Sequence, residues 1–385
     1  MTVEEITPQQ LESEIVRSLD VALVDVRPAA EVRCWKIDTN GLPFINVPED
    51  AVAADAPAAK DAVATFARDG AKVRIICNRG RSSLRAAEAL TEQGLECASV
   101  SGGMIAWSRL LAPRRLDIGS GTTVIQFMRE ARGCLSYLVA ADRDALVVDP
   151  APAVEPYVAA ARSLGARITH VLDTHVHADH LSGARSLAER EGAELHLSST
   201  SLERGIQYAE RVRPVEDGDR IEVGTAEICV LALPGHTSDN IGVLLDGRAV
   251  ICGDSLVSDS VARPDLEVGD ERAPEAARTL HDTLHRRILP LRDETILLPC
   301  HYPGGRREAP VAPTLAEVKR SVRFLALGRD EFAELSVADL PPRPVNYLNI
   351  IAVNLGAESG PDVGGLEVGA NSCAARSPAD RGVIS

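Results

Sequence analysis

The segment THVHADH, residues 174–180, places three imidazoles and one carboxylate within six residues. It follows a β-branched run over 168–173 that predicts a strand, and it precedes residues 181–191, whose apolar spacing predicts a helix. A loop at the end of a strand can aim alternate side chains at one point, and imidazole is the commonest protein ligand for metals. The segment therefore predicts a metal centre at the end of a strand in a fold of mixed strands and helices.

Three later segments repeat this arrangement of a short apolar run followed by a candidate ligand. They are LPGH (233–236), ICGD (251–254) and LPCH (298–301). Glycine in two of them lets the backbone turn sharply beside a site. Five of the nine histidines lie at these strand ends, so a chance coincidence of four separate segments is a poor explanation. The remaining histidines lack such context and are expected to be surface or capping residues: His170, His196, His281 and His285.

The segments around these ligands predict the fold class. Between 121 and 355, βαβ patterns mix with hairpin signals such as Asp246-Gly247, which lies between two strand-like runs. Such a mixture predicts helices covering sheets in a layered α/β domain. Residues 1–113 also alternate between β-branched runs and amphipathic segments, which predicts a separate α/β domain.

The ordered ligand motifs resemble the metallo-β-lactamase fold superfamily, and this resemblance implies an αββα sandwich. Dinuclear zinc hydrolases of the glyoxalase II type keep the same ligand positions, so the ligands alone do not choose among its members. Other segments are similar to the persulfide dioxygenases, the family of the ethylmalonic encephalopathy protein. These segments are 168–183, GHTSDN (235–240), GDSLVSDSVARPDL (253–266), and Leu340-Pro341-Pro342 followed by Asn349 and Asn354.

That resemblance implies one iron(II) per chain, held by His175, His236 and Asp254. The implied reaction oxidises a low-molecular-weight thiol persulfide with O₂ to sulfite and thiol. Zinc is the alternative metal, in a thioester hydrolase of the glyoxalase II type. Four further residues are expected either to orient the ligands or to hold a second metal: His177, Asp179, His180 and His301.

Arg263, in the sequence ARPDL, matches the dioxygenase position that contacts a substrate carboxylate, and a guanidinium fork suits that role. The alternative is a structural arginine paired with Asp265. The substrate is expected to be the persulfide of glutathione, coenzyme A or another small thiol, together with O₂.

A second motif, CNRGRSS at 77–83, lies between a predicted strand and a predicted helix. The N–H groups at a helix N-terminus favour an anion, and Arg79 and Arg81 add positive charge. Cys77 is therefore expected to be a reactive sulfur nucleophile rather than a buried structural thiol. The other seven cysteines lack this context.

Residues 5–112 resemble a single rhodanese domain, through LVDVR (23–27), the Cys77 loop and GGMIAW (102–107). The resemblance implies that Asp25 and Arg27 brace the loop and that Cys77 carries sulfane sulfur. Serine stands at position 82, where the family often has arginine, so a non-catalytic module or a persulfide carrier or sensor is the alternative. The expected organisation is a rhodanese-like domain (1–113), a linker (114–120), a metallo-β-lactamase-fold domain (121–355) and a flexible tail (356–385).

Composition limits the choice of partners. The net charge of −15 and the 3% aromatic content argue against nucleic acid, and no apolar run has the length of a membrane span. The first residues lack a signal-peptide pattern and the eight cysteines form no CxxC pair, which predicts a cytoplasmic protein with free thiols. No nucleic acid or membrane partner is expected, and a homodimer remains open.

Overall fold

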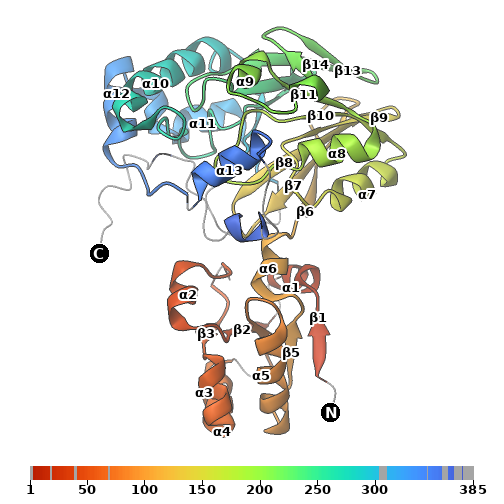
Figure 1. The fold of residues 1–385 in the computed structure, drawn as a ribbon, viewed down its shortest axis with the longest axis vertical. Helices are drawn as coiled ribbons and strands as arrows, with labels where there is room; N and C mark the ends of the chain where they lie inside the picture. The colour runs from red at the N-terminus through yellow and green to blue at the C-terminus, as the bar shows by residue number, and fades with distance from the viewer. Residues whose placement is uncertain are drawn as a thin grey trace. The chain divides into compact units, whose positions relative to one another are not determined.

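The computed structural model describes residues 3–17, 20–38, 41–67, 70–302, 310–344, 346–357, 363–367 and 375. The chain divides into two units, each with its own sheets and helices (Figure 1). The first unit is formed mainly by the residues up to Ala112, joined by Arg129–Arg132, and the second contains most of the chain from Pro113 onward.

The first unit is built on a five-stranded parallel sheet in the order β1-β5-β4-β2-β3. Its central strands are buried along nearly their whole length, as expected for a parallel sheet covered on both faces. The strands are β1 (Glu4–Ile6), β2 (Val21–Asp25), β3 (Phe44–Asn46), β4 (Lys72–Ile76) and β5 (Cys97–Val100).

Helices cover both faces of this sheet. One apolar cluster joins Val24 and Ile75 to α3, α4 and α5, and the other joins the adjacent residues Leu23 and Ile76 to α1 and α6. Successive strand residues thus point to opposite faces, which gives a three-layer α/β unit. The helices are α1 (Pro8–Val16), α2 (Ala29–Cys34), α3 (Glu49–Ala54), α4 (Ala56–Phe66), α5 (Arg81–Glu92) and α6 (Gly103–Ser108).

The second unit contains two sheets. The first has seven strands in the order β12-β11-β10-β9-β8-β7-β6, and the second has five in the order β13-β14-β15-β16-β17. The seven strands are β6 (Ala112–Leu116), β7 (Thr123–Arg129), β8 (Cys134–Ala141), β9 (Asp144–Val148), β10 (Arg167–Leu172), β11 (Glu194–Ser198) and β12 (Val212–Val215). The five strands are β13 (Arg220–Val223), β14 (Ala226–Ala232), β15 (Ile241–Leu245), β16 (Ala249–Ile251) and β17 (Ile296–Leu298).

Separate groups of helices cover these two sheets. Helices α7 (Glu155–Ser163) and α8 (Ala184–Glu191) lie against the seven-stranded sheet, and α9 (Ser199–Glu203) follows β11. The five-stranded sheet packs its apolar side chains against α10 (Gly269–Thr283), α11 (Leu315–Ser321) and α12 (Arg329–Ala338). The last α-helix is α13 (Tyr347–Asn354), and the short helices are η1 (Ala209–Arg211), η2 (Leu284–Ile288), η3 (Arg323–Ala326) and η4 (Val363–Glu367).

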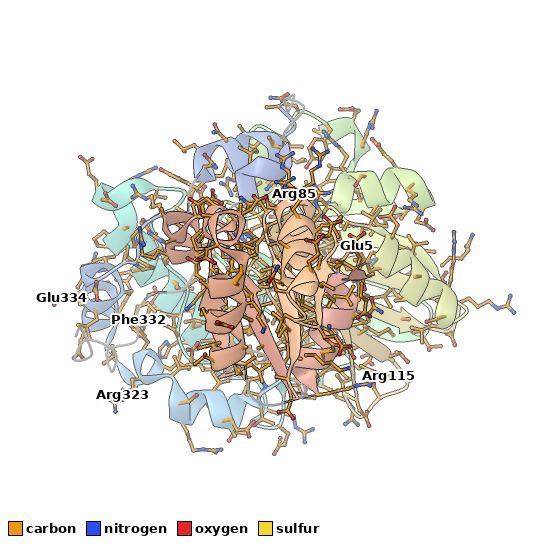
Figure 2. All side chains as sticks on the ribbon, turned by 90° about the horizontal axis from the view of Figure 1, so that it is seen from below. Glu5, Arg85, Arg115, Arg323, Phe332 and Glu334 are labelled. Atoms are coloured by element: carbon orange, nitrogen blue, oxygen red, sulfur yellow. The ribbon has the colours of Figure 1, made fainter. Side chains whose placement is uncertain are left out.

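Helix α12 illustrates how this core is formed. Phe332 and Glu334, both labelled in Figure 2, lie two positions apart on the helix; Phe332 is fully buried and Glu334 is exposed. Phe332 packs edge-on against Phe324, with ring centroids 5.7 Å apart. The apolar face of α12 therefore closes the core over the five-stranded sheet.

The prediction of a linker over 114–120 is wrong for its first half. Arg114, Arg115 and Leu116 lie in β6, the edge strand of the seven-stranded sheet beside β7. Proline and exposed arginines are common on edge strands, where they discourage pairing with other chains, so this segment has the composition of a linker and the structure of a strand.

The predicted flexible tail, 356–385, lies partly outside the described residues, and the described part of it is packed. Glu367 accepts a hydrogen bond from the Leu181 N–H at 3.0 Å. The Ala375 N–H donates to the Val261 carbonyl at 2.9 Å, and the alanine side chain joins the core beneath α10. Single anchoring residues in a Gly-rich segment leave little periodicity to detect, which explains the error. Within the described residues, no helix combines the length and apolarity needed to cross a bilayer.

Candidate metal centre

The candidate ligands follow the carboxyl ends of strands from both sheets of the second unit. The THVHADH loop follows β10, His236 follows β14, Asp254 follows β16 and His301 follows β17. All five histidines and both aspartates of these segments are buried. Strand ends from two packed sheets thus supply the whole predicted ligand set at one edge of the unit.

His175, His236 and Asp254 form one compact group, here named the central triad. Asp254 Oδ2 lies 3.8 Å from His175 Nε2 and 3.5 Å from His236 Nε2. Each side chain is about 1% exposed. Within the described structure, His175 Nε2 and Asp254 Oδ2 have no hydrogen-bond partner. Because buried polar atoms are nearly always paired, these two atoms fit a bound metal ion.

The histidine nitrogens that face away from the centre of the triad are held by hydrogen bonds. The Thr174 hydroxyl donates to Asp149, so it accepts from His175 Nδ1 at 2.9 Å, and the Nε2 lone pair of His175 faces the triad. His236 Nδ1 donates to the Arg263 carbonyl at 2.8 Å, which leaves its Nε2 lone pair toward Asp254 in the same way. Such partners fix the tautomer of a metal-binding imidazole.

Electrostatics favour the ligand forms of these groups. Burial, together with the neighbouring His177 and His236, lowers the pKa of His175 well below its usual value, so this imidazole is neutral. Burial opposes ionisation of Asp254, but His301 and His236 hold the pKa of that carboxyl below its usual value. A neutral His175 imidazole and an ionised Asp254 carboxylate are therefore present near neutral pH.

Asp149, at the end of β9, organises the THVHADH loop. Its carboxylate accepts hydrogen bonds from the Thr174 N–H (2.7 Å), the Thr174 hydroxyl (2.9 Å), His177 Nε2 (3.1 Å) and the Cys300 thiol (2.8 Å). Although burial opposes protonation of His177, Asp149 raises the pKa of that imidazole to about 10. His177 Nδ1 is also buried without a hydrogen-bond partner.

A second group of ligating atoms lies beside the triad and contains Cys134, Asp179, His180 and His301. His301 lies between two carboxylates, with Nδ1 2.6 Å from Asp254 Oδ1 and Nε2 3.0 Å from Asp179 Oδ2. The Cys134 thiol is 3.7 Å from Asp179 Oδ2. This group has the donor atoms for a second metal, with a thiol added to the predicted set.

Sequence reasoning assigned no role in the centre to four residues that the structure brings to it. Asp149 contacts His177, Cys134 contacts Asp179, and Cys300 donates to Asp149. Asn354 of α13 donates to the carbonyls of His177 and His180, both at 2.9 Å. Asp149 and Cys134 are isolated in sequence, so no spacing marks them, and Cys300 was passed over beside the candidate ligand His301. Asn354 lies more than 170 residues from the loop that it holds, and only the fold brings them together.

Arg263 is placed behind the triad. It is 1% exposed, and its guanidinium binds Asp265 at 2.7 Å and the Pro342 carbonyl at 3.1 Å. Its own carbonyl is the acceptor that orients His236. The arrangement matches the structural alternative considered for this arginine, and a substrate contact stays a prediction.

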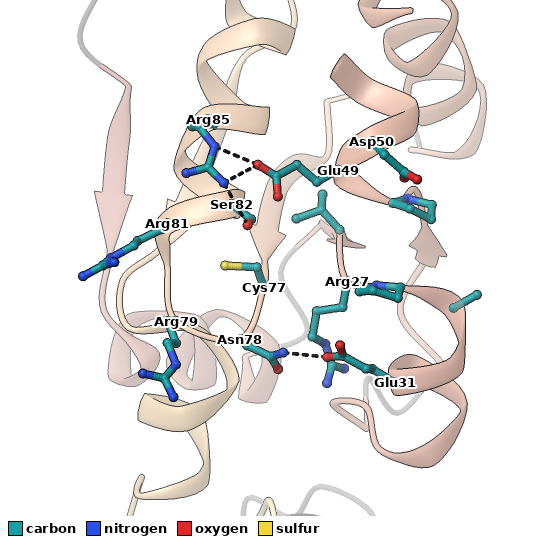
Figure 3. A pocket seen from close by; sticks show the side chains of 14 residues that line it. Arg27, Glu31, Glu49, Asp50, Cys77, Asn78, Arg79, Arg81, Ser82 and Arg85 are labelled. Atoms are coloured by element: carbon teal, nitrogen blue, oxygen red, sulfur yellow. Dashed lines mark hydrogen bonds and ion pairs between the residues drawn. The ribbon is translucent and has the colours of Figure 1, made fainter. Parts of the chain in front are cut away.

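The Cys77 loop lines a cavity of about 900 Å³ in the first unit (Figure 3). The Gly80 N–H donates to Cys77 Sγ at 3.1 Å, and Ser83 Oγ lies 3.3 Å from the sulfur. Gly80 has a φ of 84° and precedes α5, so it allows the loop to turn into the helix. Arg79 and Arg81 also line this cavity and are exposed.

Asp25 and Arg27, predicted to brace the Cys77 loop, contact other segments of the first unit. Asp25 and Arg27 form a buried ion pair at 2.7 Å. In the described part of the chain, their hydrogen bonds run to the Trp35 carbonyl and to Asn46, not to residues 77–83. The pair therefore supports the wall of the cavity to which Arg27 contributes.

Comparison with known proteins adds the family. The model of the metallo-beta-lactamase superfamily matches residues 129–301. Hydroxyacylglutathione hydrolase of Vibrio cholerae is 34% identical over 203 residues, which are 53% of this chain and 73% of that protein. This chain belongs to the metallo-β-lactamase superfamily.

Two further similar proteins carry the name ETHE1. Human persulfide dioxygenase ETHE1, a mitochondrial protein, is 30% identical over 223 residues, 56% of this chain and 82% of that protein. The crystal structure of ETHE1 from Myxococcus xanthus is 31% identical, covers 60% of this chain and 98% of its own, and has a TM-score of 0.52. Hydrolase and dioxygenase relatives thus match at similar identity. The family match begins at residue 129, beyond most of the first unit.

Proposed function

We propose that the second unit is a non-haem iron(II) persulfide dioxygenase. The observation that carries this proposal is the central triad, in which two imidazole nitrogens and one carboxylate oxygen converge and each outer atom is held by a hydrogen bond. Two histidines and one carboxylate are the ligand set of many oxygen-activating iron(II) enzymes and leave positions open for substrate and O₂.

The contacts of the two His301 ring nitrogens support one bound metal rather than two. Both of its ring nitrogens face carboxylate oxygens, of Asp254 and Asp179, and a second metal would need one of these nitrogens as a lone-pair donor. His301 instead ties the Asp254 ligand to Asp179, while Asp149 and Asn354 hold the loop that presents His175. These residues orient the ligands by hydrogen bonding.

In the proposed reaction, one persulfide anion, one O₂ and one water give one thiol, one sulfite and one proton. The outer sulfur is oxidised and O₂ is reduced. Iron(II) would supply the electron transfer between O₂ and sulfur and would hold both at one point, which removes the cost of their encounter. The chain contributes a buried site in which the Asp254 carboxylate would offset part of the metal charge and His175 and His236 would supply nitrogen ligands.

A zinc thioester hydrolase is the second candidate. It is favoured by the group of Cys134, Asp179, His180 and His301, whose ligating atoms all lie within 4.8 Å of one another. A metal there, beside the triad, would give the dinuclear centre that activates water in hydrolases. The similarity to the Vibrio cholerae hydrolase also supports this alternative.

We further propose that the first unit carries sulfane sulfur on Cys77, as a rhodanese-like module. The Gly80 N–H, which donates to the sulfur, would stabilise a thiolate or persulfide, whereas the Ser83 hydroxyl donates to the Gly80 carbonyl. The cavity of about 900 Å³ has room for a small sulfur donor. A carrier or sensor that binds persulfide without turnover is the non-enzymatic alternative for this unit.

Metal loading and substrate choice test the proposal together. Protein loaded anaerobically with iron(II) should consume O₂ and release sulfite with the persulfides of glutathione or coenzyme A, and zinc-loaded protein should not. Asp254→Asn should lose at least about 100-fold in O₂ uptake and also lose iron, because it removes a ligand. His285→Gln, which changes a histidine outside the centre on η2 after α10, should retain both. Thioester hydrolysis by zinc-loaded protein, with no O₂ uptake by the iron form, would overturn the proposal.

The mass of the intact chain tests separately whether Cys77 carries sulfur. Incubation with thiosulfate should add the mass of one sulfur atom to the wild-type chain and not to Cys77→Ser. Cys34→Ser, which removes an exposed thiol, is the control and should keep the mass gain. A mass gain that persists in Cys77→Ser would contradict the assignment of Cys77.

A further inference from the structure

His170, Glu194 and His196 form a compact group of side chains that the central triad and the Cys77 cavity do not include; we name it the strand triad. His170 lies on β10, and Glu194 and His196 lie on the parallel neighbour β11. His170 is opposite Glu194 in register, and Glu194 and His196 are two positions apart. Because side chains of a strand alternate, these three share one face of the seven-stranded sheet.

The distances within the strand triad match those around a small metal ion. His170 Nδ1 is 3.0 Å from His196 Nε2, and Glu194 Oε2 is 3.6 Å from the first nitrogen and 3.7 Å from the second. A tetrahedral zinc ion with bonds of about 2.0–2.1 Å places its ligand atoms about 3.3 Å apart. The three atoms therefore already form a triangle of nearly the required size.

The chemical state of the group also suits a metal. Burial, with His170 beside it, lowers the pKa of His196 to about 4, so its imidazole is neutral and can donate a lone pair. The His196 side chain is 3% exposed and that of Glu194 is 46% exposed. The His196 nitrogen is thus anchored in the sheet. The Glu194 carboxylate faces solvent, where a water could complete the coordination.

One neighbouring cation competes for the carboxylate. Arg213 Nη1 of β12 lies 2.5 Å from Glu194 Oε2, the same oxygen that faces the histidines. Without a metal, the group is held by this ion pair and by the contact between the two imidazoles, and His196 Nδ1 is buried without a hydrogen-bond partner in the described structure. Since Arg213 is 65% exposed, its side chain can turn to solvent when a metal takes its place.

We propose that the strand triad binds a divalent late transition metal ion of the zinc type, separate from the catalytic centre. Two imidazoles and one carboxylate supply three ligands, and a solvent water supplies the fourth. The ion would link β10 to β11 just before β10 leads into the THVHADH loop. It therefore acts as a clamp on the strand that presents His175, with no part in the reaction itself.

Zinc binding by the full-length protein tests this site. Equilibrium dialysis against Zn²⁺ followed by metal analysis should find one zinc fewer per chain in Glu194→Gln and in His170→Gln than in wild type. Glu189→Gln removes an exposed carboxylate of α8 with the same change in charge, and it should bind as much zinc as wild type. His236→Gln should lose a different zinc, so its loss should add to that of Glu194→Gln.

A second measurement guards against variants that fail to fold. Added Zn²⁺ should raise the thermal midpoint of His236→Gln, and this rise should disappear when Glu194→Gln is combined with it. Arg213→Gln should bind the strand-triad zinc several-fold more tightly, because the competing cation is gone. If Glu194→Gln and His170→Gln are folded and retain the full zinc stoichiometry, the site does not exist.

Discussion

At the scale of single residues, Asp149 is the side chain on which the ligand loop depends. One carboxylate receives four hydrogen bonds, from Thr174 twice, His177 and Cys300, while fully buried. Asp149→Asn should lower the free energy of unfolding by about 2–4 kcal/mol, because an NH₂ group then faces donors. Asp149 has a φ of 52°, a conformation that asparagine also tolerates. Backbone strain therefore does not account for the expected loss of stability. Urea unfolding with metal analysis checks this, and a change below about 0.5 kcal/mol would contradict it.

The four ligand segments could be found from sequence because histidine and aspartate directly follow short apolar runs, at 175–180, 236, 254 and 301. The side chains that contact these ligand segments could not be found from the sequence. Asp149 belongs to no motif of candidate ligands, and Cys134 is one cysteine among eight. His170 and His196 were expected to be ordinary surface or capping histidines, because they lie on different strands and their closeness depends on the register of β10 with β11.

At the scale of elements, α10 fixes the loop that carries His236. Gly235 has a φ of 139°, and a Cβ added there would lie 2.4 Å from Leu280 Cα in the last turn of α10. Gly235→Ala should therefore push the loop or the helix away, with a cost of about 2–5 kcal/mol and loss of bound metal.

Gly247→Ala is the matched control for this helix contact. Gly247 lies in the β15–β16 hairpin with a φ of 63°, and an added Cβ would meet nothing within 4 Å. It should cost about 1–2 kcal/mol of backbone strain and keep the metal. Equal metal loss in both variants would show that strain, not contact with α10, is responsible. Sequence did not reveal α10, since its apolar positions are mostly alanines with little contrast to their neighbours.

At the scale of the whole molecule, the aromatic residues report on the two units separately. Trp35 and Trp107 both belong to the first unit, whereas the second unit contains all five tyrosines. Tryptophan fluorescence therefore follows unfolding of the first unit, and near-ultraviolet circular dichroism of tyrosine follows the second. This division allows a stability change to be assigned to one unit within the intact chain.

His196 should make the second unit sensitive to acid when metal is absent. Burial and His170 lower its pKa to about 4 in the folded state, from an ordinary value near 6.5, with Glu194 and Arg213 as the other charges facing it. The unfolded chain then binds the proton more readily, so this contribution is complete above pH 6.5 and is lost as the pH falls toward 4. Between pH 7.5 and 4.5 the loss should be about 2–3 kcal/mol.

His196→Gln, studied with a chelator, should show a tyrosine-detected transition whose pH dependence is weaker by that amount, while the tryptophan-detected transition stays as in wild type. An unchanged pH dependence of the tyrosine signal would mean that His196 binds its proton equally well in the folded and unfolded chains, which would contradict its lowered pKa.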